Sequence, residues 1–305
     1  PMTAFQIIAI LLTLTAAGGY LNQRYVKVHA TIGVMAFALF ISLINILLNK
    51  SGLVDLGLAK SFVEKLDFSE ILLHGMLSFL LFAGALHINL EDLKTVKSDV
   101  SVLSTFGVFI ATVVIGTLVW LASDFIGLKL PYLYALLFGA LISPTDPIAV
   151  LSILKESGVS KKLYTKIGGE SLFNDGIGVV AFIAILGLIS ETQQLSPSSL
   201  SILLAQKVFG GIALGLLLGW ITYRLLKSID AYKVEVLLTL ALVTGGYALA
   251  EILGVSAPIF MVTAGLLVGN HGRYFGMSEQ TRVRLDDFWE LVDEILNAVL
   301  FILIG

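Results

Sequence analysis

The sequence of 305 residues has no cysteine and little charge, with only 13% of its residues charged. The lack of cysteine excludes thiol catalysis, disulfide frameworks and cysteine-ligated metal sites. In a soluble domain roughly a quarter of the residues are charged. This chain therefore has about half the usual share of charged residues with which to keep a surface hydrated. Scarce charge also excludes a disordered chain, and the net charge of −3 argues against a nucleic-acid partner.

What is present is hydrophobic sequence, at 57% of residues and a mean hydropathy of +0.95. The apolar stretches have the length of a membrane-spanning helix, about 17–25 residues, rather than the roughly ten alternating residues of a barrel strand. We therefore predict an all-α polytopic membrane protein with about ten transmembrane helices, located in the cell membrane. The ten stretches are residues 3–20, 28–48, 71–90, 99–123, 132–154, 167–190, 201–224, 233–251, 255–270 and 288–305.

The distribution of basic residues predicts the orientation, because Lys and Arg accumulate on the cytoplasmic side of a membrane protein. Fourteen of the 19 lie in or beside loops that follow odd-numbered stretches, and five follow even-numbered ones. This asymmetry predicts an N-terminus outside. The last stretch reaches the final residue, Gly305, without a polar flank, so we expect the chain to be C-terminally truncated.

Two of the stretches carry carboxylates, which are costly inside a bilayer and are therefore candidate functional groups. In the fifth stretch, Asp146 lies within Ser143-Pro144-Thr145-Asp146-Pro147. In the sixth, Glu170, Asn174 and Asp175 lie among glycines in Gly168-Gly169-Glu170-Ser171-Leu172-Phe173-Asn174-Asp175-Gly176-Ile177-Gly178.

The two aspartates are predicted at the same depth. Asp146 precedes Lys155 by nine residues and Asp175 follows Lys166 by nine, which places each about 13 Å from the connecting loop in a helix. The hydrocarbon core is about 30 Å thick, so both fall near its middle. Two carboxylates at one depth on neighbouring helices indicate a shared polar site.

The prolines predict how oxygen ligands arise at that depth. Pro144 and Pro147 have no N–H and so free the carbonyls four residues earlier, which predicts an interruption of the helix near Thr145. Unwound backbone at the midplane is the usual ion-binding device of secondary transporters. Freed carbonyls, the Thr145 hydroxyl and nearby carboxylates suit a small cation.

The sixth stretch presents two adjacent ridges, Glu170 with Asn174 and Ser171 with Asp175, each at i, i+4 spacing. Its glycines predict a close approach of the fifth stretch. Asp175 is then the central carboxylate, which binds either a proton or a metal cation, so that alternating exposure exchanges the two ions. No phosphate-binding G-x-x-x-x-G-K-[ST] motif for ATP-driven transport is present. Competing interpretations are that Glu170 pairs with Lys166 or a distant arginine, and that Ser171 is only a small packing residue.

The two polar segments together resemble the cation:proton antiporter family of NhaP and NHE type, and residues 80–86 also fit. The resemblance implies a secondary transporter, not an enzyme, that exchanges Na⁺, Li⁺ or K⁺ for H⁺ in pH homeostasis without a cofactor. It implies a cation bound by Asp175, the Thr145 backbone, Ser171 and Glu170, with Asp146 acting through water. Asn174 before Asp175 matches the electroneutral one-for-one branch.

The resemblance also implies a homodimer, and a division of this transmembrane domain, residues 1–305, into a core and a dimerisation part. The core that carries the ion site would be about residues 71–190, and the dimerisation part would include 1–48 and 201–270. Family members have about thirteen helices arranged as inverted repeats with broken helices crossing at the midplane, so the chain resembles the first three quarters of the fold.

Three other functions remain open on the residues alone. A Na⁺-coupled solute symporter on a related scaffold would need a pocket for an organic substrate. An intramembrane aspartyl protease also uses two aspartates, but its Tyr-Asp and Gly-x-Gly-Asp order is absent here, since Gly176 and Gly178 follow Asp175. A passive channel would need a pore-lining ring of groups.

Overall fold

The structure, a computed structural model, describes residues 4–50, 75–145, 158–189, 197–272 and 277–305. This part of the chain is helical and contains no β-strand. In chain order its elements, with π-helical turns marked η, are α1 Ala4–Leu21, η1 Asn22–Val26, α2 Ala30–Lys50, α4 Leu77–His87, α5 Leu90–Val102, η3 Leu103–Gly107, α6 Val108–Phe125, α7 Tyr132–Ile142, α9 Lys161–Ile189, α10 Pro197–Ser228, α11 Tyr232–Ile252, α12 Ala257–Leu267, η4 Val268–Gly272 and α14 Glu279–Ile304.

The all-α prediction is confirmed, and a helix covers at least part of each of the ten predicted stretches. Within the described residues, six helices are long and apolar enough to cross a membrane: Phe5–Val26, Ala30–Lys50, Leu90–Phe125, Lys161–Ile189, Ala205–Ser228 and Tyr232–Ile252. The helices of the other four stretches are shorter in the described part or, in α14, rich in acidic residues.

The tenth predicted stretch, residues 288–305, lies in a helix that begins before it. The structure has one continuous helix, α14, from Glu279 to Ile304, so the polar residues before position 288 form its first turns. Hydropathy could not place this start, because charged residues such as Asp286 and Asp287 interrupt the apolar run but are compatible with a helix.

The chain divides into two compact units, and the division falls within α4 and α14. One unit comprises residues 1–80 and 289–305. Its core joins one face of α1 to α2 and to the C-terminal part of α14, through buried Ile7, Leu11, Val34, Ala38, Met76, Val299 and Ile302.

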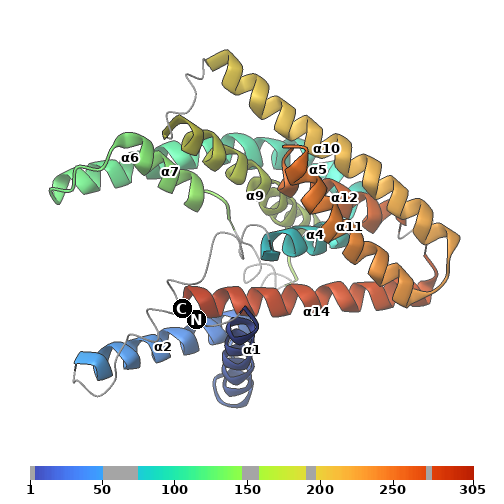
Figure 1. Cartoon of the computed structure of the whole chain (residues 1–305), viewed down its shortest axis with the longest axis horizontal. Helices are drawn as coiled ribbons and strands as arrows, with labels where there is room; N and C mark the ends of the chain where they lie inside the picture. Colours follow the sequence, from blue (N-terminus) through green and yellow to red (C-terminus); the bar gives the residue numbers. More distant parts are fainter. Residues whose placement is uncertain (1–3, 51–74, 146–157, 190–196, 273–276) are drawn as a thin grey trace. The chain divides into compact units, whose positions relative to one another are not determined.

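The other unit comprises residues 81–288 and contains both polar segments. Here α9 packs against α5, α7 and α12, while α10 packs against α11 and α12 (Figure 1). Phe82, Val243, Phe260 and Met261 are almost completely buried in this unit.

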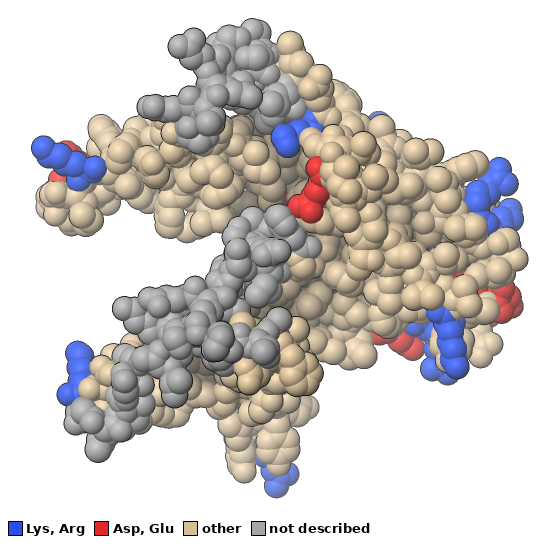
Figure 2. All heavy atoms as spheres, in the orientation of Figure 1, with Lys and Arg blue, Asp and Glu red and all other residues tan. Residues whose placement is uncertain are grey.

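The described surface is largely uncharged. Figure 2 shows Lys, Arg, Asp and Glu in small groups separated by wide areas without charge. Many large apolar side chains are exposed, among them Ile110 on α6 at 63% and Leu237 on α11 at 63%. Such exposure is expected of helices whose outer faces contact lipid rather than water.

Helices α6 and α7 approach closely at two glycines. A Cβ on Gly139 of α7 would overlap the carbonyl oxygen of Thr112, and a Cβ on Gly116 of α6 would lie 2.9 Å from the Leu136 Cα. Because both neighbours are backbone atoms, they cannot rotate away as a side chain can. Small residues at these positions therefore bring the two backbones together.

We predict that Gly139→Ala destabilises the protein by about 1–3 kcal/mol, since the added methyl forces α6 and α7 apart. The matched control is Gly245→Ala in α11, where a Cβ meets nothing within 4 Å and the change should be neutral or stabilising. Thermal unfolding of the purified variants in detergent measures the difference. Equal melting temperatures for the two variants would contradict the close approach.

Candidate functional site

The site begins where α7 ends, at Ile142. Pro144 has no N–H with which to bond the Ala140 carbonyl, and the Ser143 hydroxyl donates to this oxygen instead, at 3.1 Å. Ser143 is buried and also accepts from the Thr112 hydroxyl of α6 at 3.3 Å. The predicted interruption of the helix before Thr145 is confirmed: residues 143 and 144 bend, and Thr145 is not helical.

Thr145 is held against α9 through both its backbone and its side chain. The Ser171 hydroxyl donates to the Thr145 carbonyl oxygen at 2.5 Å, and the Asn174 amide donates to the Thr145 hydroxyl at 2.8 Å. Thr145 in turn donates to Oε2 of Glu170 at 3.2 Å. The fifth and sixth predicted stretches are therefore neighbours at these residues, as expected.

Glu170 and Asn174 form the predicted i, i+4 pair. The second amide hydrogen of Asn174 reaches Oε1 of Glu170 at 2.9 Å, so Thr145, Glu170 and Asn174 close a ring of three hydrogen bonds. Asn174 is completely buried, and its Oδ1 has no hydrogen-bond partner among the described residues. A buried amide oxygen of this kind has lone pairs available to accept a hydrogen bond or to bind a cation.

Both aspartates were predicted to share this site. Asp175 follows Asn174 on α9 and is half-buried. Asp146 follows Thr145 in the chain and lies outside the described residues, as does Lys155. The structure thus brings Thr145, Glu170, Ser171 and Asn174 into direct contact, with Asp175 one position further along the helix.

The competing interpretation of Glu170 as a partner of Lys166 receives no support from the contacts. Lys166 pairs with Asp99 of α5 at 2.9 Å, and Lys161 pairs with Asp92 of the same helix at 2.6 Å. Both pairs are partly solvent-exposed, so each contributes little to the stability of the helix pair.

The glycines of α9 let three neighbours approach it rather than one. A Cβ on Gly178 would overlap Pro144, which confirms the predicted approach of the fifth stretch. On Gly169, however, a Cβ would meet Leu93 of α5 at 2.8 Å, and on Gly176 it would meet Ile259 of α12 at 3.2 Å. The expectation that all these glycines serve the fifth stretch is therefore wrong. Gly169 and Gly176 are seven residues apart and lie on one side of α9, whereas Gly178 lies on another.

Sequence reasoning missed Thr112 and Ser143 as supports of the broken helix. Both are buried, and both are small uncharged residues within predominantly apolar stretches. A hydroxyl directly before Pro144 was the available signal, since it lies within reach of the carbonyl that proline leaves free.

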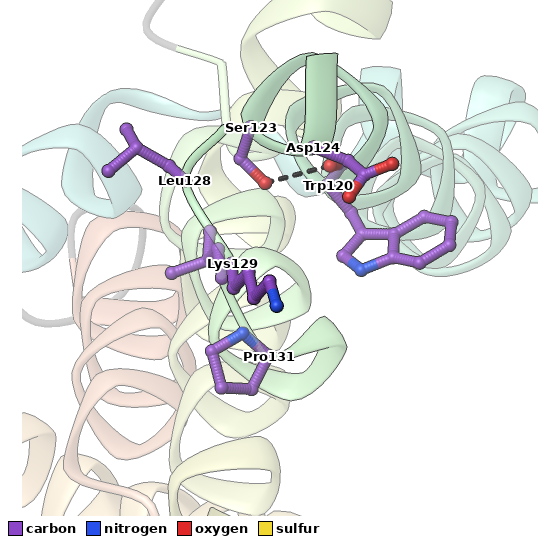
Figure 3. A pocket seen from close by; sticks show the side chains of 7 residues that line it. Trp120, Ser123, Asp124, Leu128, Lys129 and Pro131 are labelled. Carbon is purple, nitrogen blue, oxygen red and sulfur yellow. Dashed lines mark hydrogen bonds between the residues drawn. The ribbon is translucent and has the colours of Figure 1, made fainter. Parts of the chain in front are cut away.

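A surface hollow at the hairpin between α6 and α7 is lined by Trp120, Ser123, Asp124 and residues 128–131 (Figure 3). Inside it the Ser123 hydroxyl donates to the Trp120 carbonyl at 2.7 Å, which caps the last turn of α6. None of the predicted site residues lines this hollow.

The fold and site define a polytopic membrane protein whose broken helix brings backbone and side-chain oxygens to the half-buried Glu170 carboxylate and the buried Asn174 amide. This construction is typical of secondary transporters. The sequence matches the family described as sodium/hydrogen exchanger, transmembrane, over residues 7–305. The chain belongs to this family, which consists of transporters rather than enzymes.

Two characterised relatives illustrate the similarity. The chain is 50% identical over 305 residues to the Na⁺/H⁺ antiporter NhaP of Pseudomonas aeruginosa, covering 98% of this chain and 71% of that protein. It is 38% identical over 254 residues to the Na⁺/H⁺ antiporter ApNhaP of Aphanothece halophytica, covering 83% of this chain and 48% of that protein.

Among solved structures, the sodium proton antiporter MjNhaP1 from Methanocaldococcus jannaschii matches with a TM-score of 0.75. The identity is 21%, and the match covers 99% of this chain and 70% of that one. At this identity the likeness supports the fold. It confirms the expected antiporter-type architecture.

We predict that Thr145→Val destabilises the protein by about 1–2 kcal/mol, because one amide hydrogen of the buried Asn174 loses its acceptor. Thr145→Ser, which keeps the hydroxyl, is the matched control and should unfold within a few tenths of a kcal/mol of the wild type. Thermal unfolding in detergent compares them. If valine and serine behave alike, the hydroxyl does not hold the ring together.

Proposed function

We propose that the polypeptide carrying this sequence exchanges Na⁺ for H⁺ across the cell membrane, with Li⁺ and K⁺ as possible substitutes for Na⁺. Family membership and the two Na⁺/H⁺ antiporter relatives support the reaction. The single observation that carries the site is the ring formed by Thr145, Glu170 and Asn174 beside Asp175.

The chemistry follows from the kinds of oxygen that converge there. Na⁺ is a small hard cation that prefers carbonyl, hydroxyl and carboxylate oxygens. The ring and the Ser171 hydroxyl hold the Thr145 carbonyl, Glu170 and Asn174 in fixed positions. A cation beside Asp175 therefore meets prepositioned oxygens and loses its water at lower cost.

Exchange requires that proton and cation exclude one another. We infer that Asp175 is the carboxylate for which they compete, with Thr145, Ser171 and Glu170 completing the cation site and Asp146 contributing through water. When the site faces one side, Na⁺ displaces the proton. When it faces the other, a proton displaces Na⁺.

Charge balance supports one-for-one exchange. Asn174 occupies the position beside Asp175 and holds no charge of its own. Both of its amide hydrogens are donated, one to Thr145 and one to Glu170. With one titrating carboxylate, each cycle moves one positive charge in each direction, which makes transport electroneutral.

The larger organisation of the transporter is also part of the proposal. We expect a homodimer with the N-terminus outside, a core at about residues 71–190 and a dimerisation part including 1–48 and 201–270. The 14-to-5 distribution of basic residues supports this orientation. The bilayer and the two transported ions are the expected partners, with no cofactor.

The alternative functions have less support. Neither a solute symporter nor an intramembrane aspartyl protease agrees with the sodium/hydrogen exchanger family match over residues 7–305.

We predict that Asp175→Asn abolishes exchange while the protein stays folded, because a neutral amide neither releases a proton nor binds Na⁺ with full charge. The assay is dequenching of a pH-sensitive dye in proteoliposomes after adding Na⁺, Li⁺ or K⁺, with valinomycin and K⁺ to clamp the voltage. The matched control is Asp124→Asn, an exposed aspartate at the end of α6, which should exchange normally. Undiminished Na⁺-driven proton movement in Asp175→Asn would show that Asp175 is not the carboxylate for which the two ions compete.

For Asp146→Asn we predict a severe loss of exchange or a displaced pH profile, because the cation loses a nearby negative charge that acts through water. The same proteoliposome assay, repeated across a pH series, reports both outcomes. An Asp146→Asn protein with the wild-type rate and pH profile would show that this carboxylate takes no part.

A further inference from the structure

The corner between α4 and α5 is held by a residue from a distant part of the chain. Helix α4 ends at His87 and α5 begins at Leu90, and Asn89 caps the new helix by accepting from the Glu91 backbone N–H at 2.8 Å. Such a corner leaves backbone donors and acceptors without helical partners. Inside a membrane protein those groups need partners from elsewhere in the fold.

Asn270, in the π-helical turn η4, supplies these partners. Its Oδ1 accepts from the Leu90 N–H at 2.8 Å, and its amide donates to the Ile88 carbonyl at 2.9 Å and to the Leu266 carbonyl at 2.8 Å. Both amide hydrogens are therefore used. Asn270 is only 7% exposed, so water does not readily replace these bonds.

The backbones are pressed together beside this residue. A Cβ on Gly269 would overlap the Leu86 carbonyl oxygen, and a Cβ on Gly265 would lie 2.7 Å from the Ala85 Cβ. The α12–η4 segment thus lies directly on the last turns of α4. The three hydrogen bonds of Asn270 stabilise this close contact between backbones.

From this corner, α5 leads to the candidate ion site. Ile88 and Leu90 pack against the buried cluster Leu93, Val96 and Val100, and Phe173 of α9 packs against the same cluster. Gly169 of α9 also faces this cluster, since a Cβ there would meet Leu93 and Val100. Gly169 and Phe173 flank the site residues Glu170 and Ser171 in the sequence, so α5 is the surface on which the site-bearing turn of α9 rests.

We propose that Asn270 is a positioning residue for the exchange site, acting through the α4–α5 corner and the packing of α5 on α9. It touches no proposed ion ligand. It belongs to the predicted dimerisation part, whereas residues 88–90 belong to the predicted core, so its bonds join the two parts at a fixed point. This inference rests on the proposed function.

The test compares Asn270→Ala with Asn22→Ala. Asn22 is a matched control because it is also a buried asparagine in a π-helical turn, where its amide donates to the Val28 carbonyl at 2.8 Å. Asn270→Ala should raise the apparent KM for Na⁺ at least threefold and displace the pH profile of exchange in proteoliposomes. Asn22→Ala should keep the KM within twofold of the wild type and leave the pH profile in place, even if it lowers the melting temperature as much as Asn270→Ala does.

A second variant and a second measurement keep the inference testable if Asn270→Ala does not fold. Asn270→Ser retains one hydroxyl donor for a backbone carbonyl and should show the same KM change in milder form. Backbone hydrogen exchange should accelerate first in residues 88–102 and 161–175 of this variant. Wild-type KM and pH profile in the folded Asn270 variants, or acceleration spread evenly over the chain, would overturn the inference.

Failure of the proposed function would look different. In that case the wild-type protein would not exchange Na⁺ for H⁺ in the same preparation. The hydrogen-exchange comparison would still decide whether Asn270 positions α5 and α9.

Discussion

The candidate site depends on a backbone hydrogen bond that Pro144 cannot make. In a regular helix the residue at this position would bond the Ala140 carbonyl, and the chain would continue as a helix through Thr145. Here the Ser143 hydroxyl reaches that carbonyl, α7 ends, and the Thr145 carbonyl is directed to Ser171 of α9. Without this interruption the Thr145 oxygen would be consumed within α7 and unavailable to an ion.

The second constraint is the cost of burying polar groups in a largely apolar chain. Such groups are tolerated only when they bond one another. The two amide hydrogens of the completely buried Asn174 meet this condition through their bonds to Thr145 and Glu170. The ring of hydrogen bonds also holds the side chains of Thr145, Glu170 and Asn174 in one arrangement, and Asn174 directly precedes Asp175 in the sequence. We propose that the rigidity of this site, rather than a large number of charges, allows it to exchange two ions of equal charge.

Local sequence rules predicted much of this arrangement. Proline chemistry predicted the end of α7, and i, i+4 spacing predicted that Glu170 and Asn174 act together.

The lateral arrangement of helices could not be predicted from such local rules. The pairing of Lys166 with Asp99, the position of Thr112 behind Ser143 and the bonds of Asn270 to residues 88 and 90 all join distant segments. One-dimensional patterns contain no information on which faces of two helices meet. The start of α14 at Glu279 was missed because a hydropathy profile shows that its first turns carry charged residues but not that these residues are helical.

The proposed exchange depends on competition between proton and cation for one carboxylate. The most direct test is the apparent KM for Na⁺, measured in proteoliposomes at a series of pH values. Simple competition predicts that on the acidic side KM rises about tenfold for each unit by which the pH falls, while the maximal rate at saturating Na⁺ stays constant. A KM that does not change with pH, accompanied by a falling maximal rate, would contradict the claim that the two ions share Asp175.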